Sequence, residues 1–338
     1  MFTVRAAGAT LVLVLVLPYS RFWARVPGTE EEEGRIAFAS HEDGNWEIYV
    51  AEAGGNGRTR LTNRPMQDRF PVWSPGGGQI AFGSQTATGW DLWVTDADGR
   101  NSRKVASDVV PKSTRPWTPD GARILFASRV EGDVEINSVE LSTGRVTRLT
   151  RSRGEDRDPT VSPDARHAAF SSDRAGRSQL YVMEIDGSGV RPLTSGQASS
   201  TSPSWSPNGL DLAFVSDRDG SGDLYLLSSD DLSITRLTVR AHVTRDVPRW
   251  SPDGSQIAFQ IAEGGNYDIG VATVRDRSWH RVAAGAGYDG MYGWSPDGKR
   301  LVFVSGRDAN ERLYTVGGDG QDIQRITEVW SLDPAWAP

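Results

Sequence analysis

The sequence predicts an all-β fold, a single seven-bladed β-propeller built from four-stranded blades. Three observations predict it. A Trp-Ser-Pro-Asp-Gly motif recurs along almost the whole chain, with its prolines 44 or 45 residues apart, at positions 75, 119, 163, 207, 252 and 296. Three kinds of short apolar segment recur seven times in a fixed order, and an additional copy of the Trp segment stands near residue 336. A repeat of this length with four strand-sized segments is typical of a propeller blade.

The motif itself predicts a tight turn between two strands. In the copy Trp250-Ser251-Pro252-Asp253-Gly254, proline suits the second position of a type I turn, and glycine lets the chain leave the turn with a positive φ. Near-copies stand at 73–77, 117–121, 161–165, 205–209 and 294–298.

The apolar segments then follow in a constant order, which gives three further strands per repeat. An Ile-Ala-Phe type comes first, at 36–38, 80–82, 124–126, 168–170, 212–214, 257–259 and 301–303. An Ile-Tyr-Val type follows at 48–50, 92–94, 136–138, 180–182, 224–226, 269–271 and 313–315. An Arg-Leu-Thr type ends the repeat at 60–62, 104–106, 148–150, 192–194, 236–238, 281–283 and 325–327. Polar turns such as 96–99 join the last two as hairpins.

The set that begins at Ile36 has no Trp strand before it, whereas the segment Asp333-Pro334-Ala335-Trp336-Ala337-Pro338 matches 70–75 in type. We therefore expect the C-terminal Trp336 strand to complete the N-terminal blade and close the ring, which would remove its free edges.

The first residues resemble a targeting segment. Arg5 precedes an apolar run from Ala6 to Leu17 that Pro18 ends, and twelve residues are too few to span a bilayer, which takes about 20. We expect residues 1–20 to be a signal peptide or an uncleaved N-terminal anchor, residues 21–34 an acidic spacer, and residues 35–338 the propeller. The protein is then periplasmic or extracellular, or else held at the membrane by this segment alone.

Composition excludes several classes of function. The net charge is −7 and the basic residues are scattered, which argues against nucleic-acid binding, since that requires a concentrated basic face. The chain has no cysteine, so disulfides and thiolate chemistry are excluded.

The repeat unit Trp-Ser-Pro-Asp-Gly-x-x-Ile-Ala-Phe, with Ser216-Asp217-Arg218-Asp219-Gly220 and Leu224-Tyr225 behind it, resembles the TolB-type propeller repeat, which is also found in tricorn-like and prolyl-oligopeptidase-like proteases. The resemblance covers about residues 35–338. It implies a propeller scaffold that binds a protein or peptide partner, including a component of the cell envelope. The chain departs from TolB itself, whose propeller has six blades after an α/β domain.

Catalytic and metal-binding patterns are not evident. His41, His167, His242 and His280 fall at four different phases of the repeat, so we expect no metal site and no cofactor. Neither a Gly-x-Ser-x-Gly elbow nor a His-Glu-x-x-His helix is present. The loop 217–223 has the carboxylate density of a calcium loop without the EF-hand spacing, so a hydrogen-bonding loop between blades is the favoured interpretation. The repeated tryptophans are expected to be wedges between blades.

We therefore expect function on a loop face or in the central channel. The connections that precede the Trp strands differ most between repeats, and their charged and aromatic residues predict a ligand or partner face comprising Asp68, Arg69, Arg115, Asp156, Arg157, Asp158, Asp289 and Tyr292. The hypothesis is a monomeric, non-catalytic, exported scaffold. The alternative is a propeller enzyme of the polysaccharide type, an oligogalacturonate lyase or a hydrolase.

Overall fold

A computed structural model describes residues 34–110, 116–285 and 287–338. Within these residues the chain forms 27 strands and no helix, so no described helix is a candidate for crossing a membrane. The targeting segment expected at 1–20, and all of the acidic spacer except Gly34, lie outside the described residues. The all-β class predicted from the repeats is confirmed.

The strands follow the predicted order. The Ile-Ala-Phe type corresponds to β1 (Arg35–Ser40), β5 (Gln79–Gln85), β8 (Arg123–Val130), β12 (His167–Ser172), β16 (Asp211–Ser216), β20 (Gln256–Glu263) and β24 (Arg300–Ser305). The Ile-Tyr-Val type corresponds to β2 (Glu47–Glu52), β6 (Trp90–Asp96), β9 (Asp133–Glu140), β13 (Gln179–Glu184), β17 (Asp223–Ser228), β21 (Asn266–Thr273) and β25 (Arg312–Gly317).

The Arg-Leu-Thr segments provide short outer strands, and the Trp segments provide inner ones. The outer strands are β3 (Thr59–Arg60), β7 (Arg103–Val110), β10 (Val146–Arg148), β14 (Arg191–Pro192), β18 (Ile234–Arg236), β22 (Ser278–Ala283) and β26 (Gln324–Arg325). The inner strands are β4 (Asp68–Trp73), β11 (Asp156–Val161), β15 (Ser200–Trp205), β19 (Arg249–Trp250), β23 (Asp289–Trp294) and β27 (Ser331–Trp336). Most outer strands have only two or three residues, which limits the exposed edge of each sheet.

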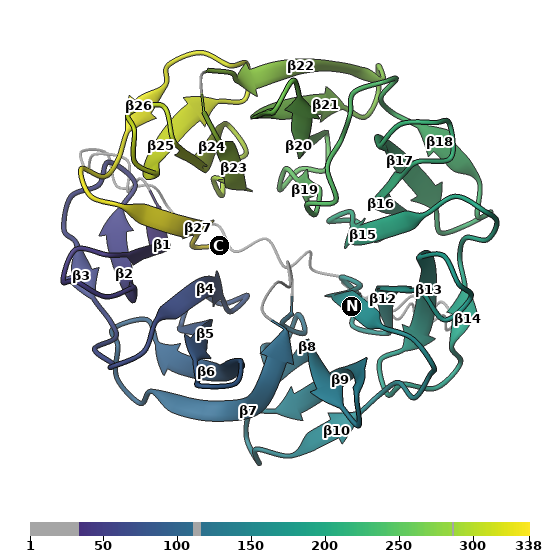
Figure 1. Cartoon of the computed structure of the whole chain (residues 1–338), viewed down its shortest axis with the longest axis horizontal. Helices are drawn as coiled ribbons and strands as arrows, with labels where there is room; N and C mark the ends of the chain where they lie inside the picture. The colour runs from purple at the N-terminus through teal and green to yellow at the C-terminus, as the bar shows by residue number, and fades with distance from the viewer. Residues whose placement is uncertain (1–33, 111–115, 286) are drawn as a thin grey trace, which may run out of the picture. The chain divides into compact units, whose positions relative to one another are not determined.

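The strands pair into six sheets that lie around a central axis (Figure 1). Five sheets have four strands each: β27-β1-β2-β3, β11-β12-β13-β14, β15-β16-β17-β18, β19-β20-β21-β22 and β23-β24-β25-β26. β27 pairs antiparallel with β1, with Ile36 opposite Trp336 and Ser40 opposite Ser331. The C-terminal Trp segment therefore forms the inner strand of the sheet that contains β1.

The sixth sheet differs from the prediction of separate four-stranded blades. It has seven strands, β4 to β10, because the end of β7 continues into pairing with β8 through Val109 opposite Ser128 and Val110 opposite Ala127. Trp117 then forms only an isolated bridge with Ile124. The long β7 therefore occupies part of the position that an inner strand has in the other sheets.

Each turn motif folds as its residue types predict. The backbone N–H of Gly254 donates to the carbonyl of Ser251 at 2.9 Å, and Gly254 has φ of +74°. The hydroxyl of Ser251 donates to Asp253 Oδ1 at 2.6 Å, so the serine and the aspartate hold the turn together. Ala165 occupies the glycine position in one repeat and still has φ of 58°.

Three of the repeated tryptophans link neighbouring sheets, as expected of wedges. The indole N–H of Trp250 donates to the carbonyl of Ser204 on β15, and that of Trp294 donates to the carbonyl of Arg249 on β19. Trp73 likewise donates to the carbonyl of Ala335 on β27 at 3.0 Å. These bonds join the inner strands one to the next.

The arginine and threonine of the Arg-Leu-Thr segments recur because they contact a buried carboxylate. Glu135, at the start of β9, is buried and accepts hydrogen bonds from Thr150 Oγ1 at 2.5 Å and Arg148 Nη2 at 2.9 Å. Burial is the largest single influence on the pKa of Glu135, and it raises that pKa. The hydrogen bonds together outweigh burial, so the pKa of Glu135 lies below its usual value. Asp223, Thr238 and Arg236 repeat the arrangement. In each such sheet the arginine therefore balances the charge of a buried carboxylate, and the threonine donates a hydrogen bond to it.

Candidate functional site

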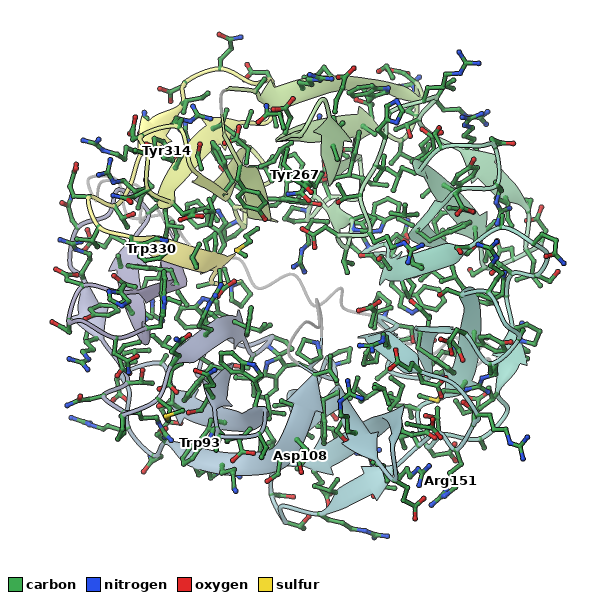
Figure 2. The ribbon with its side chains drawn as sticks, in the orientation of Figure 1. Trp93, Asp108, Arg151, Tyr267, Tyr314 and Trp330 are labelled. Carbon is green, nitrogen blue, oxygen red and sulfur yellow. The ribbon has the colours of Figure 1, made fainter. Side chains whose placement is uncertain are left out.

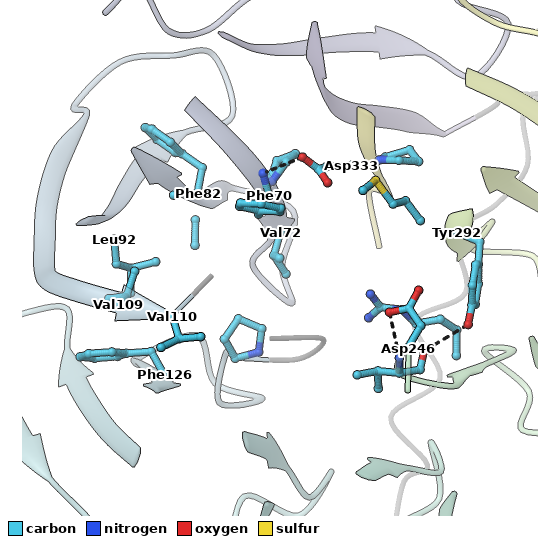
Figure 3. A pocket seen from close by; sticks show the side chains of 18 of the residues that line it. Phe70, Val72, Phe82, Leu92, Val109, Val110, Phe126, Asp246, Tyr292 and Asp333 are labelled. Carbon is cyan, nitrogen blue, oxygen red and sulfur yellow. Dashed lines mark hydrogen bonds between the residues drawn. The ribbon is translucent and has the colours of Figure 1, made fainter. Parts of the chain in front are cut away.

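A cavity of about 400 Å³ lies between the inner strands of the described sheets (Figure 3). Its walls come from β4, β23 and β27, from the strands β5 to β8, and from the connection that precedes β19. The volume is within the range of small-ligand pockets, roughly 300–1,000 Å³.

One wall of the cavity is apolar. Its side chains include Val72, Phe82, Leu92, Val110 and Phe126, which come from the five consecutive strands β4 to β8 (Figure 3). Because β7 and β8 pair directly, they bring Val109, Val110 and Phe126 together at this wall. The seven-stranded sheet therefore positions a continuous apolar surface toward the cavity.

The other wall is polar and is built around Gln260. The Gln260 Nε2 atom donates to the carbonyl of Asp289 at 3.0 Å, and Thr244 Oγ1 donates to Gln260 Oε1 at 3.0 Å. Tyr292 Oη donates weakly to the carbonyl of Val247 at 3.4 Å. Tyr288, Asp246 and Arg249 line the same wall.

Burial governs the ionisation of this wall. It raises the pKa of Tyr288 to about 12 and raises the pKa of Tyr292 as well, so both phenols keep their protons at neutral pH. Burial also lowers the pKa of the Arg249 guanidinium, an effect that the nearby Asp246 opposes. The polar wall thus presents neutral hydroxyls and an amide beside the Asp246 carboxylate and the Arg249 guanidinium.

The predicted carboxylates are buried in strands rather than displayed on loops. Asp68, Asp156 and Asp289 each begin an inner strand, and all three side chains are almost fully buried. Each faces a serine on the neighbouring strand, namely Ser84, Ser172 and Ser305.

An arginine lies close to each of these three carboxylates, and those beside Asp156 and Asp289 donate hydrogen bonds to them. Arg174 Nη2 lies 2.7 Å from Asp156 Oδ2, and Arg307 Nη2 lies 3.4 Å from Asp289 Oδ2. The same guanidinium groups lie over the rings of Phe170 and Phe303. The carboxylates at these two positions therefore contribute to the packing of the sheets.

The remaining predicted site residues have varied positions. Tyr292, expected on a loop, is buried in β23 and lines the cavity. Arg69 Nε donates to Asp333 Oδ2 at 2.8 Å, and Arg157 pairs with Glu155. Asp158 has φ of 52° and accepts a 3.4 Å hydrogen bond from Ser171. Arg115 lies outside the described residues.

Sequence reasoning identified Tyr292 but missed the rest of the polar wall, Arg249 in particular. Arg249 directly precedes the Trp250 of its repeat, where the other inner strands have Val72, Thr160, Ser204, Gly293 and Ala335. Aligning the repeats would have identified it as the one long cationic side chain at that position. Gln260 and Tyr288 give no comparable signal, because their approach depends on how two sheets pack.

The loop with the carboxylate density of a calcium site is used by the fold. Asp217 Oδ1 accepts the backbone N–H of Ser199 at 2.7 Å, and Asp219 accepts the hydroxyl of Tyr225 at 2.6 Å. Arg218 lies over the rings of Phe214 and Tyr225. These contacts stay within and beside the sheet β15-β16-β17-β18, so the carboxylates of the loop serve hydrogen bonds inside one sheet, whereas a link between blades was predicted.

The histidines lie in different surroundings. His41 contacts the rings of Trp46 and Trp330, His280 Nε2 lies 3.0 Å from the carbonyl of Gly318, and His167 lies beside Glu184. Among the residues that the structure describes, no three His, Cys, Asp or Glu side chains converge on a possible metal position.

Comparison with known proteins identifies a family that shares this repeat. A family model for the TolB beta propeller domain matches residues 84–246 and 241–338. No curated protein sequence matches the chain significantly.

Solved structures share the fold. TolB from Acinetobacter baumannii is 20% identical, with a TM-score of 0.61 over 91% of this chain and 68% of that one. An oligogalacturonate lyase from Vibrio parahaemolyticus is 15% identical, with a TM-score of 0.71 over 84% and 86% of the two chains. A prolyl endopeptidase is 13% identical, with a TM-score of 0.68, and the match covers 91% of this chain and 50% of that one.

Proposed function

Since the chain belongs to the TolB beta propeller domain family, we propose that residues 35–338 form a closed seven-bladed propeller that acts as an exported, non-catalytic scaffold for a protein or peptide partner. The partner segment binds in the central cavity and over the loops around its mouth. The resemblance to TolB favours a partner in the cell envelope, and therefore a periplasmic or extracellular location, with the segment 1–20 as signal peptide or anchor.

Three features support seven blades. The Ile-Ala-Phe, Ile-Tyr-Val and Arg-Leu-Thr strands each occur seven times. The seven-stranded sheet divides naturally between β7 and β8, and Trp117 stands where the inner strand of the second half would lie. The pairing of β27 with β1, together with the Trp73 bond to Ala335, supports closure between the two ends of the repeat array.

The cavity is the observation that carries the binding proposal. An apolar wall opposite a wall of hydroxyl, amide and guanidinium groups can accept an apolar side chain while hydrogen-bonding the backbone beside it. From the predicted face, Arg69 adds a polar group beside the cavity through its hydrogen bond to Asp333, which lines it.

The proposal is tested by filling the cavity. Val72→Phe adds a ring at the apolar wall, whereas Val146→Phe adds the same ring at an exposed position of β10. Each variant is used to capture partners from a cell-envelope fraction of the source organism, after circular dichroism has confirmed folding. Loss of the captured protein with Val72→Phe alone supports the proposal, and equal recovery with both variants contradicts it.

The alternative is a polysaccharide lyase or hydrolase. It rests on the fold that this chain shares with the oligogalacturonate lyase. A lyase would release unsaturated products from oligogalacturonate, which absorb in the ultraviolet. Turnover by the wild-type protein that Val72→Phe abolishes would establish this alternative and overturn the scaffold proposal.

A further inference from the structure

On one group of loops, five exposed arginines carry guanidinium groups without a partner in the described structure. They lie on the connections that lead from one sheet to the next or from an Ile-Ala-Phe strand to its neighbour, and they are Arg151, Arg153, Arg177, Arg240 and Arg245. By contrast, Arg157 pairs with Glu155, Arg174 with Asp156 and Arg236 with Asp223. The fold therefore uses some arginines internally and leaves these five available to solvent.

The loops that carry them form a continuous series of contacts. The backbone N–H of Glu155 donates to Asp173 Oδ1 at 2.7 Å, and Gly154 is packed so closely against Asp173 that no Cβ atom would fit there. This places the loop of Arg151 and Arg153 on the turn that precedes Arg177. We call this series the arginine arc.

The arc continues toward the cavity. Ser178 Oγ donates to the carbonyl of Ser200 at 3.3 Å, and Ser202 Oγ donates to the carbonyl of Arg245 at 2.7 Å. Arg245 lines both the central cavity and a smaller one of about 240 Å³ beside it. The arc thus runs from the margin, where Figure 2 shows Arg151, to the wall of the central cavity.

The acidic groups on the same loops are already engaged. Asp173 and Asp217 accept backbone N–H groups, Asp246 accepts that of Val247, and Glu155 pairs with Arg157. Each of these carboxylates already has a partner, whereas each free guanidinium offers five N–H donors in a planar fork that matches a carboxylate. The arc is therefore suited to bidentate contacts with carboxylates.

We infer that the partner is a peptide segment that places an apolar or aromatic side chain in the central cavity and acidic residues beside it along the arginine arc. This inference rests on the proposed function and adds the partner's chemistry. A peptide is favoured over a nucleic acid, because the net charge of −7 opposes the approach of a polyanion, whereas a short acidic segment needs only local contacts. A peptide also follows an arc that bends toward a cavity, which a flat lipid surface does not.

The inference is tested with a phage-displayed library of random dodecapeptides selected on the wild-type protein. We expect the enriched peptides to carry an aromatic or large apolar residue next to Asp or Glu. Enriched peptides that are apolar but not acidic would overturn the inference and leave the proposed function standing. Failure to enrich any peptide above an unrelated control protein, or enriched peptides that bind Val72→Phe as well as wild type, would overturn the proposed function itself.

Matched variants then locate the acidic contacts. Arg151→Glu with Arg153→Glu reverses two charges on the arc, and Arg275→Glu with Arg277→Glu reverses two exposed charges in the β21–β22 turn. By fluorescence anisotropy, we expect the first pair to weaken an enriched peptide about tenfold or more, and the second less than about twofold. Equal effects of the two pairs would contradict the inference that the arginine arc binds the acidic residues of the peptide. The inference would also be contradicted if wild type bound vesicles of phosphatidylglycerol and the Arg151→Glu, Arg153→Glu variant did not, because the arc would then bind lipid.

Discussion

Asp68 allows a sharp test of how the fold handles its buried charges. It begins β4 as Asp156 begins β11, but Thr86 stands where the corresponding sheet has Arg174. Among the described residues, no group donates a hydrogen bond to either carboxylate oxygen of Asp68, although Arg64 Nε lies 3.4 Å from Oδ2. The guanidinium of Arg64 stacks 3.3 Å from the centre of the Trp93 ring instead.

The consequence is a destabilising carboxylate at neutral pH. Burial raises the pKa of Asp68 from its ordinary 3.8 to about 6, and the nearby Ser84 and Thr62 hydroxyls and Arg64 offset only part of that effect. Since one pKa unit corresponds to about 1.4 kcal/mol, the ionised group costs the folded state about 3 kcal/mol above pH 6. The folded state holds the proton more tightly, so this cost is absent below about pH 4 and grows as the pH rises to about 6.

Asp68→Asn removes the charge and keeps the shape. The new amide must find acceptors, at a cost of about 1 kcal/mol or more, so we expect a net gain of about 1–2 kcal/mol at pH 7. In thermal melts this gain is a rise of a few degrees, which should vanish at about pH 4. The control is Asp156→Asn, which leaves Arg174 without its ion pair and should lower the melting temperature at pH 7.

Two results would refute this reasoning. One is a lower melting temperature for Asp68→Asn at pH 7. The other is a gain of the same size at pH 4 and pH 7, since a pH-independent gain would come from packing rather than from ionisation.

Three further predictions concern the fold and export. Deleting residues 333–338 should expose the edge of β1 and cause aggregation or a large fall in melting temperature, because β27 is its partner there, and an unchanged melt would contradict closure. Gly254→Ala should lower the free energy of unfolding, measured by chemical denaturation, by about 1 kcal/mol because Gly254 has φ of +74°. Gly78→Ala should have almost no effect, because Gly78 has open space around it and no positive φ. Equal losses in the two variants would argue against strain in the turn. A reporter fused after residue 34 should be active outside the cytoplasm and inactive there when Val14 and Leu15 are replaced by Arg, and cytoplasmic activity of the unmodified fusion would count against export.

The local features of the sheets could be predicted because they depend on residues close in sequence. The Ser-Pro-Asp-Gly turns, the order of strands and the partner of β1 all follow from residue types repeated at a constant spacing. The position of Trp336 relative to Ile36 was predictable for the same reason, since it repeats the relation between Trp73 and Ile80. The inner strand expected in the third repeat was not predicted correctly. There β7 extends into pairing with β8, and no residue type indicates where β7 ends.

The candidate site was less predictable, since its properties arise between repeats. Asp68, Asp156 and Asp289 have the charge expected of an exposed loop, and the sequence does not show that strand pairing buries them. Likewise Arg157 and Arg153 look equivalent in the sequence, yet only Arg157 meets a carboxylate in the described structure.

By itself, then, the sequence determined the all-β class, the repeat, the turns and the pairing of the last strand with the first, because a period of 44 residues encodes them locally. Tertiary structure alone decided which arginines remain unpaired, which carboxylates are buried, and that Val110, Gln260 and Arg249 line one cavity. The physical reason is that burial and pairing depend on distances between side chains of different sheets, and sheet packing sets those distances.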